Sequence, residues 1–162
     1  MRVLEKTIII CAIMVGFLCN YAYAGNSLDE LIQSHKTPRS VGEWIDWNLW
    51  YAEEPEGQDY WQSPQETFDL KSGDCDDAAI LAMYILQKHG YKCYILMVWN
   101  KNSGHMVCVV TLDDGFCYIS SEGYVSVWTK NMLEIPGEVL YDYNDYKYAG
   151  WDYVLRRLGN RR

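Results

Sequence analysis

The sequence predicts a single domain of the α+β class, with helices in its first half and an antiparallel sheet in its second. Apolar residues recur at helical spacing up to about residue 90. Beyond Gly90 the chain changes to short segments rich in β-branched and aromatic residues, separated by turns. Together these patterns predict helices packed on an antiparallel β-sheet.

Residues 1–24 have the features of a cleaved export signal. Arg2 and Lys6 give a positive start, residues 7–19 form an apolar run, and Ala22-Tyr23-Ala24 supplies the small residues that a signal peptidase recognises. The run is too short to span a bilayer comfortably, so cleavage before Gly25 is favoured over an uncleaved anchor. We therefore expect a periplasmic or secreted protein with a mature domain over residues 25–162 and no stable membrane insertion.

The composition excludes some classes of function. The 162 residues carry a formal net charge of −8, which argues against nucleic acid as a partner because phosphate would be repelled. Four cysteines remain after cleavage, and none belongs to a C-x-x-C pair, so structural zinc is not expected. Cys93, Cys108 and Cys117 lie in apolar segments, where a free cysteine behaves as a small hydrophobic residue. Disulfides are the alternative in an exported chain.

Capping patterns mark the expected helices. Ser27 with Glu30 opens a helix to about Lys36, and Ser40 with Glu43 opens a second one. Apolar and aromatic side chains then recur at helical spacing, and we interpret this stripe as core rather than as a ligand platform. Its members are Val41, Trp44, Ile45, Leu49 and Trp50.

Further elements follow in order along the chain. Residues 53–60 form a polar loop, and Ser63-Pro64 starts a short helix that ends near Leu70. A longer apolar helix runs from about Cys75 to a left-handed cap at Gly90. Strands are expected over residues 91–99, 105–112, 116–120 and 123–128, with a tight hairpin at residues 113–115. The aromatic tail, residues 141–158, should lie across the domain and end in a helical turn or two.

Cys75 is the candidate nucleophile. A thiol must be deprotonated to attack, and a helix N-terminus and a nearby imidazole both favour the thiolate. Cys75 follows Gly73 and Asp74 at the predicted helix start, where backbone N–H groups can also stabilise an oxyanion. Asp74, Asp76 and Asp77 would oppose thiolate formation if they pointed toward it, so we expect them to cap the helix or face solvent.

His105 is the candidate base. It opens a strand after Gly104, at a sheet edge that can face the start of the Cys75 helix. His35 ends an early helix. His89 lies at the far end of the Cys75 helix, roughly 20 Å from the thiol, and is better explained as a cation at a helix C-terminus.

Three segments resemble the transglutaminase-like superfamily, and most closely its bacterial cysteine peptidases. They are residues 73–79 (GDCDDAA), the helix end at His89-Gly90, and residues 104–107 (GHMV); residues 61–66 (WQSPQE) also resemble the lead-in to the nucleophile helix. The likeness covers about residues 58–125. It implies a papain-like core, a Cys–His–Asp triad, and hydrolysis of amide bonds or acyl transfer to amines.

The third triad position departs from the family. The matching residue is Ser120, or Ser121 if the register shifts by one. A serine can accept a hydrogen bond from the imidazole but brings no negative charge, so it would stabilise the imidazolium less well than an aspartate. Glu122 is an alternative if its side chain folds back.

Two smaller signals concern a metal and the oxyanion. Some peptidases of this group bind calcium beside the nucleophile, and Asp74, Asp76 and Asp77 are suitable oxygen ligands; helix capping is the alternative, and no other cofactor is expected. Trp61 or Gln62 is a candidate side-chain donor to the oxyanion. The alternative places Trp61 in the core and Gln62 on the surface.

The sequence thus predicts an exported cysteine hydrolase (a thiol protease) that uses Cys75, His105 and Ser120 on a protein or cell-wall peptide. An amine in place of water would make it a transglutaminase. Two other readings stay open. One is a papain-like module that binds protein or peptide without turnover, which a buried, neutral Cys75 would favour. The other is a disulfide-stapled structural protein in which Cys75 pairs with another cysteine.

Overall fold

The computed structural model describes residues 27–55 and 59–159, so the predicted export signal lies outside the described residues. The chain divides into two units, Met1–Leu31 and Ile32–Arg162. Helix α2 (Leu28–Ser34) begins in the first unit. Its predicted capping box is confirmed, because the Glu30 N–H donates to Ser27 Oγ (3.2 Å) and the Ser27 N–H donates to Glu30 Oε2 (2.9 Å).

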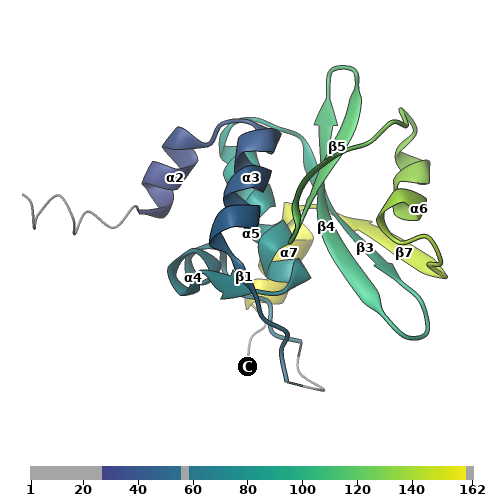
Figure 1. The fold of residues 1–162 in the computed structure, drawn as a ribbon, viewed down its shortest axis with the longest axis horizontal. Coiled ribbons are helices and arrows are strands. Elements are labelled where there is room, and N and C mark those ends of the chain that lie inside the picture. Colours follow the sequence, from purple (N-terminus) through teal and green to yellow (C-terminus); the bar gives the residue numbers. More distant parts are fainter. Residues whose placement is uncertain (1–26, 56–58, 160–162) are drawn as a thin grey trace, which may run out of the picture. The chain divides into compact units, whose positions relative to one another are not determined.

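The second unit contains a five-stranded antiparallel sheet in the order β6-β5-β4-β3-β7 (Figure 1). The first four of its strands along the chain confirm the predicted ones within a few residues: β3 (Cys93–Trp99), β4 (Gly104–Leu112), β5 (Gly115–Ser120) and β6 (Gly123–Ser126). The aromatic tail was not predicted to form a strand. It supplies β7 (Asp145–Ala149), which pairs with β3, and then helix α7 (Trp151–Gly159).

Helices cover both faces of this sheet. One face packs on α5 (Cys75–Lys88), most of whose side chains are fully buried. On the other face, Leu96, Val98, Val107 and Val109 pack with Ile135, which begins α6 (Ile135–Val139) after a short 3-10 turn, η1 (Met132–Glu134). Figure 1 shows α5 and α6 on opposite sides of the sheet. Successive side chains of a strand point to opposite faces of the sheet, so the residues that pack on α5 and those that pack on α6 alternate along each strand.

Helix α3 (Pro38–Asn48) begins earlier than predicted. Thr37 is the N-cap and Ser40 is the third helical residue: the Ser40 N–H donates to Thr37 Oγ1 (3.2 Å), and the Thr37 N–H donates to Ser40 Oγ (3.1 Å). Pro38 is well suited to the first helical position, which explains the shift from the predicted Ser40–Glu43 pair. The predicted core stripe holds for Val41 and Ile45, whereas Trp50 lies beyond the helix end and is 79 % exposed.

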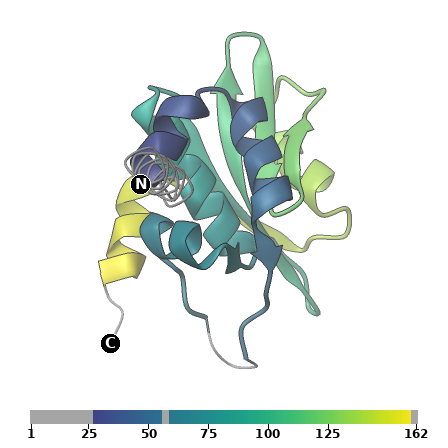
Figure 2. The ribbon, with the colours of Figure 1, turned by 60° about the vertical axis from the view of Figure 1, so that its left-hand side comes forward.

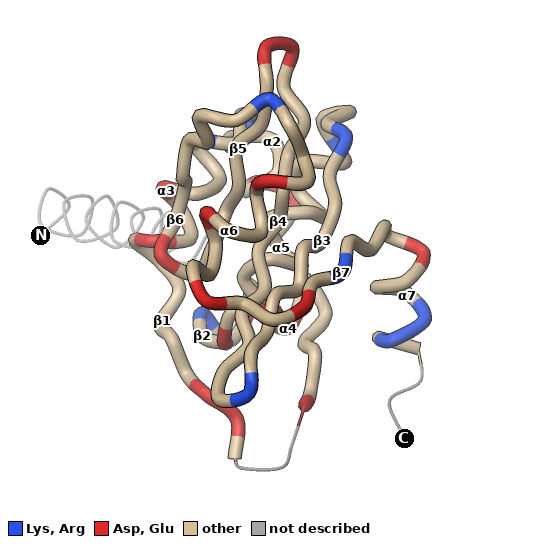
Figure 3. The backbone as a smooth tube through the Cα atoms, turned by 90° about the vertical axis from the view of Figure 1, so that its right-hand side faces the viewer, with Lys and Arg blue, Asp and Glu red and all other residues tan. Residues whose placement is uncertain are grey.

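Two short strands, not predicted, lead to Cys75. β1 (Trp50–Tyr51) pairs in parallel with β2 (Ser72–Gly73), which comes after the predicted helix α4 (Pro64–Leu70). The C-terminal helix α7 lies beside α5 (Figure 2), with the Trp151 ring 5.8 Å from that of Tyr84. Its last turn carries basic residues, which are blue in Figure 3. Among the helices in the described ranges, none combines the length and the apolar character that crossing a bilayer requires.

Candidate active site

Cys75 is the first residue of α5, as predicted. Asp74 Oδ1 accepts the N–H of Asp76 (3.0 Å), and the Asp74 N–H donates to Asp77 Oδ2 (3.3 Å), so that Asp74 and Asp77 form a capping box. Gly73 is required here, because a Cβ at this position would collide with the Asp77 carboxylate. The Gly-Asp-Cys-Asp-Asp motif therefore encodes a helix start with a half-buried thiol at its first position.

The start of α5 lies against the start of β4. The pairing of β4 with β5 ends at Cys108, so the first residues of β4 have no strand partner on that side. There the backbone of Met106 lies close enough to the Cys75 thiol to act on its pKa. Asp74 acts electrostatically on both Cys75 and His105, the residue before Met106. The structure thus brings together the elements that carry the predicted nucleophile and base.

Both groups are neutral near pH 7. Burial, and then the charge of Asp74, raises the pKa of the Cys75 thiol to about 12, and the Met106 N–H only partly opposes this. Burial lowers the pKa of His105, while Glu122 and Asp74 act to raise it. The candidate nucleophile is therefore a thiol rather than a thiolate, and its proton must leave as it attacks.

Ser120 is buried at the end of β5, with 5 % of its surface exposed. By strand alternation it shares a sheet face with Val107 and His105, which is the face that packs on α6 and not the face that packs on α5. Its Oγ accepts the backbone N–H of Glu122 (3.1 Å). This is the one hydrogen bond of its side chain within the described residues, so the part of Ser120 in a triad stays a prediction.

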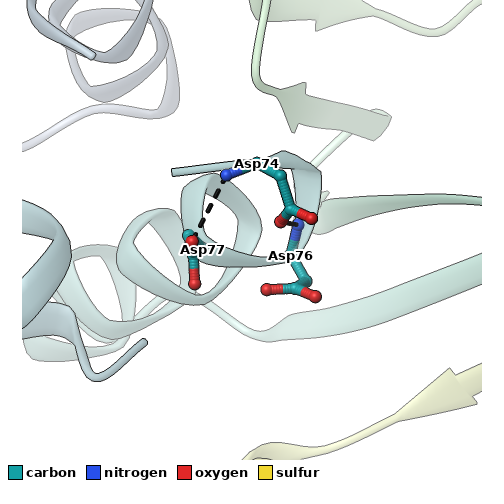
Figure 4. Close-up of side chains that lie close together, drawn as sticks. All are labelled: Asp74, Asp76 and Asp77. Atoms are coloured by element: carbon teal, nitrogen blue, oxygen red, sulfur yellow. Dashed lines mark hydrogen bonds between the residues drawn. The ribbon is translucent and has the colours of Figure 1, made fainter. Parts of the chain in front are cut away.

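Three carboxylates gather beside the thiol. Oxygens of Asp74, Asp76 and Asp77 lie within 4.8 Å of one another (Figure 4). The expectation that these acids cap the helix is confirmed for Asp74 and Asp77. The expectation that they otherwise face solvent is wrong for Asp76, which is only 6 % exposed because the helix start packs inward.

The acidic cluster contains acceptor atoms without donors. Within the described residues, Asp76 Oδ1 and Gln62 Oε1 are buried and have no hydrogen-bond partner. The Gln62 N–H donates to Asp77 Oδ1 (2.7 Å), so Gln62 lies beside the cluster rather than on the surface. Burial, and then the Asp74 charge, raises the pKa of Asp76 to about 10, and burial raises the pKa of Asp77 to about 6. A hard cation would satisfy these oxygens and their charge, so the residues present fit calcium.

Trp61 and Tyr51 are two aromatic residues near the site. Trp61 is buried against Tyr153, and its Nε1–H donates to Asp59 Oδ1 (2.9 Å), which favours the core interpretation over an oxyanion donor. Tyr51, from the unpredicted β1, lies near the thiol. Burial is the largest effect that raises the pKa of its hydroxyl, and the electrostatic effect of Cys75 is the second largest. A two-residue strand has no reliable sequence signal, so Tyr51 could not have been found from the sequence.

The state of the cysteines and the place of His89 are also defined. Cys75, Cys93, Cys108 and Cys117 are free thiols in the described part of the chain, which contradicts the disulfide-stapled reading. His89 is the C-cap of α5, and its Nε2 lies 2.7 Å from the Ile32 carbonyl oxygen at the far end of that helix.

Comparisons with known proteins agree with this architecture. A family model described as a transglutaminase-like domain matches residues 25–141. Among solved structures, Legionella pneumophila LapG is similar, with 24% identity and a TM-score of 0.51 over 60% of this chain and 64% of that chain. Its calcium-bound form gives 23% identity and a TM-score of 0.51 over 66% of this chain and 72% of that chain. This likeness shows a shared fold, and the chain spans less than two thirds of the first of these structures. A search of curated proteins finds no match.

Proposed function

Since the chain belongs to the transglutaminase-like domain family, we propose that it is an exported cysteine hydrolase that cleaves amide bonds in a protein or cell-wall peptide. The observation that carries this proposal is the position of Cys75. It begins α5, and its thiol lies close enough to the backbone of Met106, the residue directly after His105, for that backbone to act on its pKa. The export part rests on the charged, apolar and small-residue pattern of residues 1–24.

The reaction follows from these positions. The Cys75 sulfur attacks the amide carbonyl carbon while its proton passes to His105, and backbone N–H groups at the start of α5 stabilise the oxyanion. The carbon–sulfur bond forms, the carbon–nitrogen bond breaks, and His105 gives the proton to the leaving amine. Water then hydrolyses the thioester to a carboxylic acid and restores the thiol. An amine in place of water would give a transglutaminase.

Calcium is part of the proposal. Asp74, Asp76 and Asp77 would hold it, with Gln62 Oε1 as a further buried oxygen nearby. When bound, it supplies positive charge that offsets the carboxylates beside the nucleophile. The similarity in fold to a calcium-bound LapG structure supports this assignment.

A binding module without turnover is the second candidate, and one observation favours it. The Cys75 thiol is neutral, with a pKa raised to about 12 by burial and then by Asp74, and an ordinary triad would hold an acid where Ser120 stands. Such a module would keep the site between α5 and β4 as a peptide-binding surface.

Alkylation of Cys75 by iodoacetamide between pH 5 and 9, with calcium present, distinguishes the two candidates. The measurement compares wild type, His105→Ala and His35→Ala, with labelling read by mass spectrometry. An enzyme should label fast below pH 7, lose at least about tenfold in rate on His105→Ala, and be unaffected by His35→Ala. Slow labelling that is the same in all three proteins would reject the hydrolase and support the binding module.

A further inference from the structure

The turn between β5 and β6 places an acid beside the candidate base. Ser120 pairs with Gly123, so Ser121 and Glu122 form a two-residue turn. The register of β4 and β5 sets Cys108 opposite Ile119. Continued by one residue, the same register places Ser120 opposite Val107, and the chain then turns toward β6. The turn that carries Glu122 therefore lies beside the first residues of β4, which have no partner in β5 and include His105.

Close packing fixes this turn in place. Gly123 has a φ of +101°, and a Cβ there would lie 3.1 Å from Asp46 Cβ and 3.2 Å from the Gly42 carbonyl oxygen. Gly42 itself touches β6, since a Cβ on it would lie 2.5 Å from the Tyr124 nitrogen. Helix α3 and the turn therefore meet backbone to backbone. Residue 122 is held by this contact and by the hydrogen bond from its own N–H to Ser120 Oγ (3.1 Å).

Ser120 and Glu122 offer different chemical groups near His105. The hydroxyl of Ser120 shapes the turn, while the negative charge that a triad needs is on Glu122. We propose that Glu122 is the positioning residue that orients His105 and stabilises its imidazolium. This inference rests on the proposed hydrolase and names the residue that replaces the aspartate of the family.

The charges around His105 agree with this assignment. Glu122 from the turn and Asp74 from the start of α5 both raise the pKa of His105 against the effect of burial. Glu138, another exposed acid, acts with Glu122 on Tyr118 but is not among the groups that act on His105. Glu138 therefore provides a matched control.

NMR titration of the His105 imidazole in wild type, Glu122→Gln, Glu122→Asp and Glu138→Gln tests the proposal in the folded protein. Glu122→Gln should weaken proton binding by His105 about threefold at low salt. The effect is of this modest size because the Glu122 carboxylate is exposed and water screens its interaction with the imidazole. Glu122→Asp should restore part of this effect, and Glu138→Gln should match wild type. Salt at about 1 M should remove the difference in the proton affinity of His105 between wild type and Glu122→Gln. An unchanged His105 titration in Glu122→Gln, or an equal change in Glu138→Gln, would overturn the proposal.

A second readout separates this inference from the proposed function. The rate of iodoacetamide labelling of Cys75 in Glu122→Gln should fall about threefold, and thermal melting should show the variant to be as stable as wild type. If His105→Ala slows labelling and Glu122→Gln does not, the hydrolase stands and Glu122 is not its positioning residue. If Glu122→Gln shifts the His105 titration while His105→Ala leaves labelling unchanged, Glu122 does act on His105 but the hydrolase is rejected.

Discussion

Replacing Asp76 by Asn should stabilise the calcium-free protein, although it removes a native side chain. Asp76 is 6 % exposed, its Oδ1 has no partner within the described residues, and burial followed by Asp74 raises its pKa from 3.8 to about 10. At pH 7 the folded state keeps a proton that the unfolded chain releases, which costs about 4 kcal/mol at most. Asn has the same shape, is always neutral, and offers an N–H donor to Asp77. We expect a gain of about 1–3 kcal/mol.

The pH dependence gives this prediction a sign. Because the folded state binds the Asp76 proton more tightly than the unfolded chain, the contribution of this residue to stability falls as pH rises from about 4 to about 10. In EGTA, the stability difference between Asp76→Asn and wild type should therefore widen from pH 5 to pH 8. Calcium should reverse the order of the two proteins. At a concentration a thousand times its Kd, it adds about 4.1 kcal/mol to wild type and much less to the variant.

Urea unfolding, followed by tryptophan fluorescence with EGTA or with calcium, measures these differences. Asp114→Asn, at an exposed hairpin acid, is the matched control and should change stability by less than about 0.5 kcal/mol in both buffers. A variant Asp76→Asn that is less stable than wild type in EGTA would refute the reasoning. It would show that the carboxylate makes a favourable interaction in the absence of metal.

Three further outcomes are expected. Gly42→Ala should lower the free energy of unfolding by about 2–3 kcal/mol, because its Cβ would lie 2.5 Å from the Tyr124 nitrogen, whereas Gly150→Ala, with no atom within 4 Å, should be nearly neutral in thermal melts. In EGTA at pH 7.5, Cys75 should react with iodoacetamide at least about tenfold more slowly than in the urea-unfolded chain, because its pKa is raised to about 12 by burial and then by Asp74. Calcium should speed the reaction of the folded protein. Equal rates with calcium and with EGTA would contradict a metal beside the thiol. Non-reducing alkylation of unfolded protein that lacks residues 1–24 should modify all of Cys75, Cys93, Cys108 and Cys117, and a disulfide-linked peptide in the digest would restore the stapled reading.

The features that the sequence predicts well are local. The capping box at Ser27 and the helix start at Ser63 depend on residues close together in the sequence, and both are present. The start of α5 at Cys75 follows in the same way from its Gly-Asp lead-in. The strands are found because alternation and β-branched residues are visible within single segments. The start of α3 was placed too late because two capping pairs overlap, and Pro38 decides between them.

The features that the sequence misses depend on distant contacts. β7 is a strand because it pairs with β3, and nothing within residues 145–149 requires this. Burial of Asp76 results from the packing of the helix start, so its raised pKa could not be read from the motif. Glu122 is one of several alternatives in the sequence, and its position follows only from the turn that ends β5 beside the start of β4 and from the contact of that turn with α3.

The position of β7 has a consequence for the order of folding. β3 is almost entirely apolar (CYILMVW), and it is β7, made more than forty residues later in the chain, that covers its outer edge. While the chain is being synthesised, this edge presents unpaired N–H and C=O groups on an apolar strand, which is the arrangement that recruits strands from other molecules. A protein that ends at residue 141, where the family match ends, would keep this edge open permanently and should aggregate through β3.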